Sequence, residues 1–146
     1  MAQRRGAVAR RQGVTARGLA LFLALAAAAV LARPAQASNC GEGLAQRVQG
    51  SGLTVAFSTQ PMPIKVGQHF ELTGVVCPAS GLPLPNTLRV DADMPAHRHG
   101  MNYRASTELQ ADGRFSSRGL LLHMPGRWRF IFDMGATRLT HDLIVE

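Results

Sequence analysis

The chain has 146 residues and a formal net charge of +7, a balance that would suit binding to nucleic acid. The charge is uneven, however, because residues 1–37 hold six arginines and no acid, whereas the remainder holds ten Lys or Arg and nine Asp or Glu. A surface that follows phosphates needs clustered excess cation, so the composition argues against a nucleic-acid partner. The nearly neutral remainder is long enough for one domain with one modest core.

Residues 1–37 have the three parts of a cleavable signal peptide. Met1–Arg17 is basic, residues 18–32 are uninterruptedly apolar, and Ala35-Gln36-Ala37 offers a small-x-small cleavage site. The apolar stretch is shorter than the roughly 20 residues that a bilayer span needs, so an uncleaved membrane anchor is the weaker alternative. We expect mature protein that does not span the membrane, begins at Ser38 and is periplasmic or otherwise extracytoplasmic; Sec and twin-arginine export both remain open.

Two cysteines follow the signal peptide, Cys40 and Cys77. An isolated pair in an oxidising compartment typically forms a disulfide. Lipidation of Cys40 is the alternative, but Asn39 is large for the residue that precedes a lipidated cysteine. We therefore predict a Cys40–Cys77 disulfide within a mature chain that consists of an N-terminal extension, residues 38–52, and one domain, residues 53–146.

The extension is expected to contain a short helical turn around Leu44–Val48. Beyond it, apolar and polar residues alternate with period two between Pro- and Gly-rich turns, which is typical of half-buried strands. The predicted strands are residues 53–59, 69–77, 87–94, 103–109, 114–122, 127–134 and 138–145. This pattern predicts an all-β fold, a single immunoglobulin-like antiparallel β-sandwich of about seven strands.

Alternating strand direction would bring three connections to one end of this sandwich: residues 61–68, residues 95–102 and the turn at Pro125-Gly126. The mature chain has five histidines and five methionines, and all except Met134 and His141 fall in or beside these connections. The sequence therefore predicts a concentration of imidazole and thioether groups at one end of the domain.

The central motif is Met-Pro-Ala-His-Arg-His-Gly-Met at residues 94–101. In an extended backbone, His97 and His99 would project to the same side, because side chains repeat every two residues. Imidazole suits both Cu(I) and Cu(II), and thioether selects Cu(I). We therefore predict a copper site with ligands drawn from His97, His99, Met101 and Met94, completed by either His123 or Met124.

Zinc is the rival metal, because His97, His99 and His123 could form a site of three imidazoles. The neighbouring thioethers make copper the better fit, since they contribute little to zinc. Met94 could instead be core packing, and His141, in phase with its apolar neighbours, is expected to be a partly buried structural histidine. No nucleophile and base fall together in the sequence, so an enzyme is not expected.

Three motifs resemble the YtkA-like/FixH-like domain family: Val90–Met101, Asp112–Phe115 and Leu122–Trp128. The similarity covers most of the mature chain, from about residue 53 to the end. The resemblance implies a small exported or membrane-tethered immunoglobulin-like domain that is associated with copper handling or cytochrome oxidase maturation.

By the same resemblance, Met94, His99 and Met124 match recurrent Met and His positions of the family, whereas His97 stands where a methionine is common. We expect an exported copper-binding accessory or carrier protein whose partner is a membrane redox or copper-transport protein. The alternative is a metal-free interaction module that docks on a membrane or redox complex.

Overall fold

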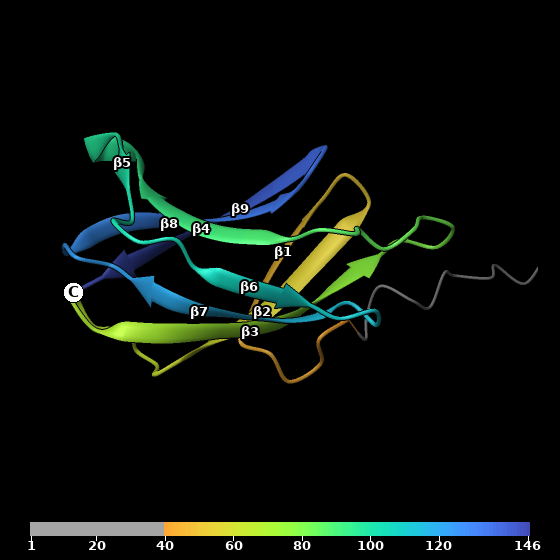
Figure 1. Cartoon of the computed structure of the whole chain (residues 1–146), viewed down its shortest axis with the longest axis horizontal. Coiled ribbons are helices and arrows are strands. Elements are labelled where there is room, and N and C mark those ends of the chain that lie inside the picture. The colour runs from red at the N-terminus through yellow and green to blue at the C-terminus, as the bar shows by residue number, and fades with distance from the viewer. Residues whose placement is uncertain (1–39) are drawn as a thin grey trace, which may run out of the picture. The chain divides into compact units, whose positions relative to one another are not determined.

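The computed structural model describes residues 40–146, so the predicted signal peptide and its cleavage site lie outside the described residues. The described residues form two antiparallel sheets that pack face to face (Figure 1). The predicted all-β sandwich is therefore confirmed. Within residues 40–146, no helix is long and apolar enough to cross a membrane.

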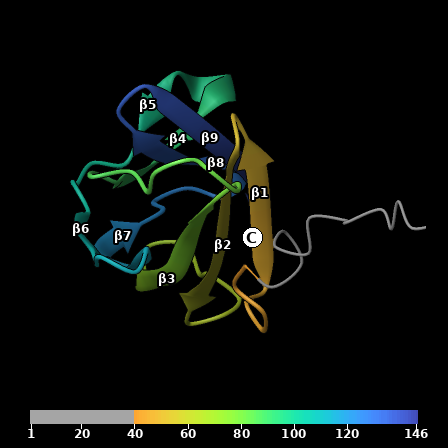
Figure 2. The same ribbon diagram turned by 90° about the vertical axis from the view of Figure 1, so that its right-hand side faces the viewer.

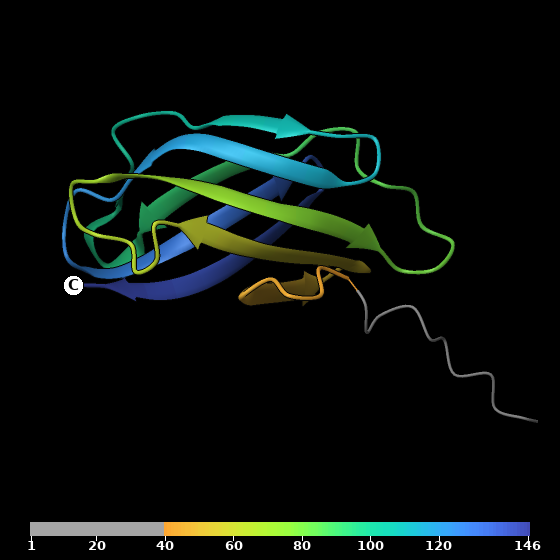
Figure 3. The ribbon, with the colours of Figure 1, turned by 90° about the horizontal axis from the view of Figure 1, so that it is seen from below.

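The larger sheet contains five strands, which Figure 3 shows side by side. In spatial order these are β1 (Gln46–Gly50), β2 (Leu53–Gln60), β3 (His69–Pro78), β7 (Arg114–Leu121) and β6 (Ser106–Leu109). Apolar side chains alternate along them, so that Val55 and Phe57 of β2 and Leu72 of β3 point into the sandwich. This inner face forms one half of the core.

The smaller sheet contains four strands and faces the first sheet from the opposite side of the core (Figure 2). In spatial order these are β5 (His99–Gly100), β4 (Arg89–Met94), β8 (Gly126–Met134) and β9 (Thr137–Val145). Strand β8 alternates most clearly, because Trp128, Phe130 and Phe132 are buried while the residues between them are only partly covered.

The strand order has immunoglobulin-like topology. Without β1 and β5, the two sheets have the orders β2-β3-β7-β6 and β4-β8-β9, which is the ABED and CFG arrangement of the seven-stranded immunoglobulin sandwich. These seven strands are the seven that the sequence predicts, with ends that differ by up to three residues. The two further strands, β1 and β5, lie at sheet edges.

The structure corrects four local predictions. The helical turn expected around Leu44–Val48 is wrong, because this segment contributes to β1, where Val48 pairs with Val55. The sandwich therefore begins before residue 53. The loop after β4 is not extended but forms a 3₁₀ turn, η1 (Pro95–His97), and β6 begins only at Ser106.

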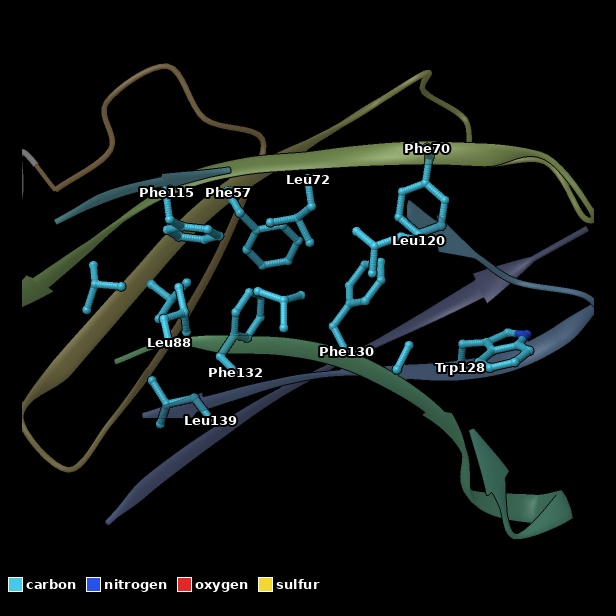
Figure 4. Packing of buried hydrophobic residues seen from close by; sticks show 14 of the residues in the cluster. Phe57, Phe70, Leu72, Leu88, Phe115, Leu120, Trp128, Phe130, Phe132 and Leu139 are labelled. Carbon is cyan, nitrogen blue, oxygen red and sulfur yellow. The ribbon is translucent and has the colours of Figure 1, made fainter. Parts of the chain in front are cut away.

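Large aromatic side chains fill the core between the sheets (Figure 4). Phe57 of β2 lies against both Phe130 and Phe132 of β8, with ring centroids 5.9 and 5.0 Å apart. Trp128 is fully buried at the end of the core beside β5 and η1, where its Nε1 donates a hydrogen bond of 2.9 Å to the carbonyl oxygen of Met124. A rigid indole thus underlies the loops at this end.

The predicted Cys40–Cys77 disulfide is confirmed, with Cα atoms 6.0 Å apart. It ties the segment before β1 to the last residues of β3, at the opposite end of this strand from His69. Both cysteines therefore lie at the opposite end of the sandwich from the histidines.

Candidate functional site

The three connections expected at one end of the sandwich do lie there, on the left in Figure 1. They are residues 61–68 between β2 and β3, residues 95–105 between β4 and β6, and residues 122–125 between β7 and β8. The first and third are joined directly, because the amide of Gly67 donates a 2.8 Å hydrogen bond to the carbonyl of Leu122. We refer to this region as the histidine end.

The 3₁₀ turn η1 breaks the alternation that an extended loop would have. Proline begins it at Pro95, and Arg98 ends it in the left-handed region with φ of 56°. Because the backbone reverses between them, His97 and His99 do not project from an extended strand as expected. His97 is exposed, whereas His99 is half-buried.

His99 faces the core because of its pairing with β4. It lies directly opposite Met94 in the antiparallel β4–β5 ladder, and directly opposed residues present their side chains on the same face. Met94 is 2% exposed and belongs to the core. The imidazole of His99 therefore lies over the end of the core, and its Nδ1 is 3.3 Å from the carbonyl oxygen of Gly100.

His123 meets His99 from the other side of the histidine end. The centroids of the two imidazoles are 5.0 Å apart, and the planes are inclined by 32°. Both rings meet the indole of Trp128 steeply, with centroids 6.0 Å from His99 and 5.4 Å from His123. Two imidazoles and one indole thus form a compact three-ring cluster that closes the end of the core.

Two polar atoms at this end are buried and lack a hydrogen-bond partner: Nδ1 of His123 and Oδ1 of Asp93. Such atoms are rare in folded proteins, because an unsatisfied buried polar group costs about 1–3 kcal/mol. Asp93 lies opposite Gly100 of β5 and opposite Arg129 of β8. Nδ1 of His123 thus has no partner within the described residues, whereas Nδ1 of His99 lies 3.3 Å from the carbonyl oxygen of Gly100.

His97 lies at the outer edge of this cluster. Its ring centroid is 5.8 Å from that of His99. Within residues 40–146, no three side chains among His, Cys, Asp and Glu converge closely enough to hold one metal ion. The three-imidazole arrangement considered for zinc is therefore not formed in this structure.

The three predicted methionine ligands lie in segments next to those that carry the imidazoles. The methyl group of Met94 lies under Gly126, where a Cβ would come within 2.7 Å of it. Met101 and Met124 are partly buried and pack against the core, and the amide of Met101 is held by the carbonyl of Ala92 at 3.1 Å. All three thioethers thus belong to elements that adjoin the two paired imidazoles.

Trp128 and Asp93 were not singled out as site residues from the sequence. Trp128 appears there as one more inward residue of an alternating strand, and Asp93 as an outward one. The spacing of Trp128 five residues after His123 is the only available signal. Their proximity to the imidazoles depends on how β4, β5 and β8 pair.

A separate cleft of about 680 Å³ opens between the edge strands β1 and β9. Phe57, Phe130 and Leu143 line it, and the exposed side chains of Met62 and Ile144 stand at its rim. The ring of His141 also lines it, 5.2 Å from Phe57, which agrees with the partly buried structural role expected for this histidine. None of the three clustered rings contributes to the cleft.

In comparisons with protein families, with curated proteins and with solved structures, the chain has no match.

Proposed function

We propose that this chain is an exported copper-binding accessory or carrier protein, with His99 and His123 as its imidazole ligands. The observation that carries the proposal is the buried, unpartnered Nδ1 of His123 in a pair of imidazoles 5.0 Å apart. Two imidazoles that share one tetrahedral metal ion have ring centroids about 5 Å apart, because metal–nitrogen bonds are about 2 Å long. The spacing therefore suits a shared ion.

Thioethers complete the proposed ligand set. Met94, Met101 and Met124 all belong to elements that adjoin the imidazole pair, and a mixed set of imidazole and thioether favours copper over zinc, with Cu(I) preferred. Between the two candidates in the β7–β8 turn, His123 is the better ligand, because its ring centroid lies 5.0 Å from that of His99 and its Nδ1 is buried without a partner. The thioether is then drawn from Met94 or Met101. His97 is exposed at the outer edge of the cluster and is not one of the two imidazole ligands proposed here.

The carrier assignment rests on the exposure and composition of the site. The imidazole rings of His99 and His123 are half-buried at the end of the sandwich rather than enclosed deep in the core, which suits exchange of an ion with a partner. Both cysteines form the disulfide, so neither supplies the thiolate of a blue-copper electron-transfer centre or of a nucleophilic enzyme. The disulfide also supports an oxidising, extracytoplasmic location. The resemblance to YtkA-like/FixH-like domains stays a prediction.

A metal-free interaction module is the second candidate. Exposed Tyr103 and Met62, at 58% and 65%, stand in the connections of the histidine end, and such side chains are common in protein contacts. Under this alternative the imidazole pair would only close the core against Trp128.

Copper titration of purified protein distinguishes the two functions. We expect about one Cu(I) per chain in competition with a chromogenic chelator, and loss of this binding in the variant H99A/H123A. The matched control is H69A/H141A, which removes two imidazoles outside the three-ring cluster and should bind as the parent protein does. Binding that survives H99A/H123A would refute the ligand assignment, and the absence of binding by the parent protein would favour the interaction module.

A further inference from the structure

Most cationic side chains of the domain that form no ion pair lie at the histidine end. Residues 40–146 contain ten Lys and Arg residues. Six of them form ion pairs with carboxylates: Arg89, Arg114, Arg118, Arg127, Arg129 and Arg138. Of the other four, Arg47 donates to the carbonyl of Cys40. The remaining three are exposed residues of the histidine end, namely Lys65, Arg98 and Arg104.

The connections that carry these cations contain no acid. Residues 61–68, 95–105 and 122–125 include neither Asp nor Glu. Glu146 shares the wall of the apolar cleft with Lys65, so Arg98 and Arg104 account for most of the uncompensated charge. Residues 40–146 as a whole have ten cations and nine acids, a net charge of +1. Asp93, at the end of β4, forms no ion pair within residues 40–146 and is the carboxylate that adjoins the three-ring cluster. The exposed connections of the histidine end, rather than its whole surface, are therefore the positive part of a nearly neutral domain.

These positive connections adjoin the proposed copper site. Arg98 lies between His97 and His99 in the chain, and Arg104 follows the exposed Tyr103. A positive potential lowers the local concentration of free cations and attracts anionic surfaces. The approach of a hydrated copper ion along these exposed connections is thus slowed, whereas a ligand that brings carboxylates with the metal is attracted to them.

We infer that the histidine end is a docking surface for a protein with an acidic face, which exchanges copper with this chain in a transient complex. Arg98, Arg104 and Tyr103 supply the contact, since Arg and Tyr are the residue types that most often anchor protein interfaces. The metal-exchange part of this inference rests on the proposed function. The docking part does not, because it depends only on the exposed residues.

Two synthetic peptides can test the inference. Both carry a pair of methionines, and they differ only in bearing several glutamates or several lysines. Each is loaded with Ag(I), a redox-inert substitute for Cu(I), and transfer to the purified protein is followed by the emission of Trp128, the sole tryptophan. We expect transfer from the acidic peptide to be at least about tenfold faster at low salt. The difference should largely vanish at 1 M salt, where the Debye length is about 3 Å.

The variant R98E/R104E should reverse the preference for the acidic peptide. The matched control R114E/R138E makes the same charge change at the other end of the sandwich and should preserve the preference. Equal transfer rates from both peptides, or a preference unaffected by R98E/R104E, would overturn the inference. Tighter binding of the protein to vesicles of anionic phospholipid than to the acidic peptide, dependent on Arg98 and Arg104, would also overturn the inference. A membrane surface would then be the partner.

Two further measurements separate this inference from the proposed function. Titration with Ag(I) alone establishes whether the chain binds a soft cation, and its failure would count against the proposed function only. Anisotropy of the fluorescently labelled, metal-free peptides then measures docking without metal. Selective binding of the acidic peptide, lost in R98E/R104E, would support the docking surface in either case, and its absence would refute it.

Discussion

The ring centroid of His99 lies 5.0 Å from that of His123, and both imidazoles pack steeply against the indole of Trp128. His99 reaches this position because β5 pairs it with Met94 of the core, and His123 because it lies in the four-residue connection, 122–125, from β7 to β8. Four strands of both sheets thus determine the geometry of the pair. Under the proposed function, a cluster positioned in this way would bind an ion with little rearrangement, which lowers the cost of binding.

The two histidines of the central motif should differ strongly in their importance. His99 is half-buried in the cluster and His97 is exposed at its edge. We expect H97A to lower Cu(I) affinity by no more than about tenfold, because His97 lies outside the proposed ligand shell. We expect H99A to lower it by more than about 100-fold, because a direct ligand is lost. Chelator competition measures both. Equal losses in the two variants would contradict the roles assigned to them.

The single tryptophan should report on occupancy of the site. Trp128 lies within 6.0 Å of both proposed imidazole ligands, so a paramagnetic Cu(II) ion between them would quench its emission. We expect the emission to fall on titration with Cu(II) and to level off at about one equivalent. In H99A/H123A the emission should stay constant, and in H141A it should fall as in the parent protein. Quenching that persists in H99A/H123A would place the ion elsewhere.

The disulfide should stabilise the fold without affecting the site. It closes a loop with a sequence separation of 37 at the end of β3 away from the histidines. In the chain-entropy description, its loss in C40S/C77S should lower the free energy of unfolding by roughly 3–4 kcal/mol. Urea denaturation measures this change. Copper affinity should be unchanged below the denaturing range, and a parallel loss of affinity would show that the two ends are coupled.

Acid should weaken the outer face of the smaller sheet. Hydrogen bonds from Arg138 and then Arg89 hold the pKa of Asp133 below its ordinary value of 3.8, and a hydrogen bond from Arg129 does the same for Asp142. Because these pKa values are lower in the folded than in the unfolded chain, the stabilisation is complete above about pH 4 and is lost as the pH falls through the folded values.

The double variant D133N/D142N tests this dependence. Its urea midpoint should be lower than that of the parent protein at pH 7, and the gap between the two should narrow as the pH falls from 5 towards 2. A gap that stays constant over this range would show that the two carboxylates do not contribute through their charge. All residues concerned lie on the solvent side of β4, β8 and β9, away from the imidazole pair.

The seven principal strands were predictable because each buries one face and exposes the other. Strand β1 was not, since Gln46, Arg47 and Gln49 leave Val48 as its only apolar residue before Gly50. An edge strand of this kind is stabilised by its backbone pairing to β2 rather than by an apolar stripe. Strand β5 is too short to give any pattern, although it is the element that directs His99 towards the core.

The gathering of the three connections at one end followed from strand direction, but the arrangement of the side chains within it did not. The motif predicted that His97 and His99 project to the same side, whereas η1 leaves His97 exposed at the edge, and His99 lies nearer to His123, one of the two residues expected to complete the site. That outcome depends on the left-handed conformation at Arg98, a non-glycine residue for which this conformation is uncommon. A conformation imposed by the surrounding fold leaves no local signal in the sequence.

X-ray absorption at the copper edge of protein loaded with one Cu(I) per chain resolves nitrogen from sulfur ligands. We expect a mixed shell in which two imidazole nitrogens at about 2.0 Å and at least one thioether sulfur at about 2.3 Å surround the ion. The outer-shell scattering of both imidazoles should disappear in H99A/H123A and persist in H97A. A shell that contains no sulfur, or one that is unchanged in H99A/H123A, would contradict the proposed copper site.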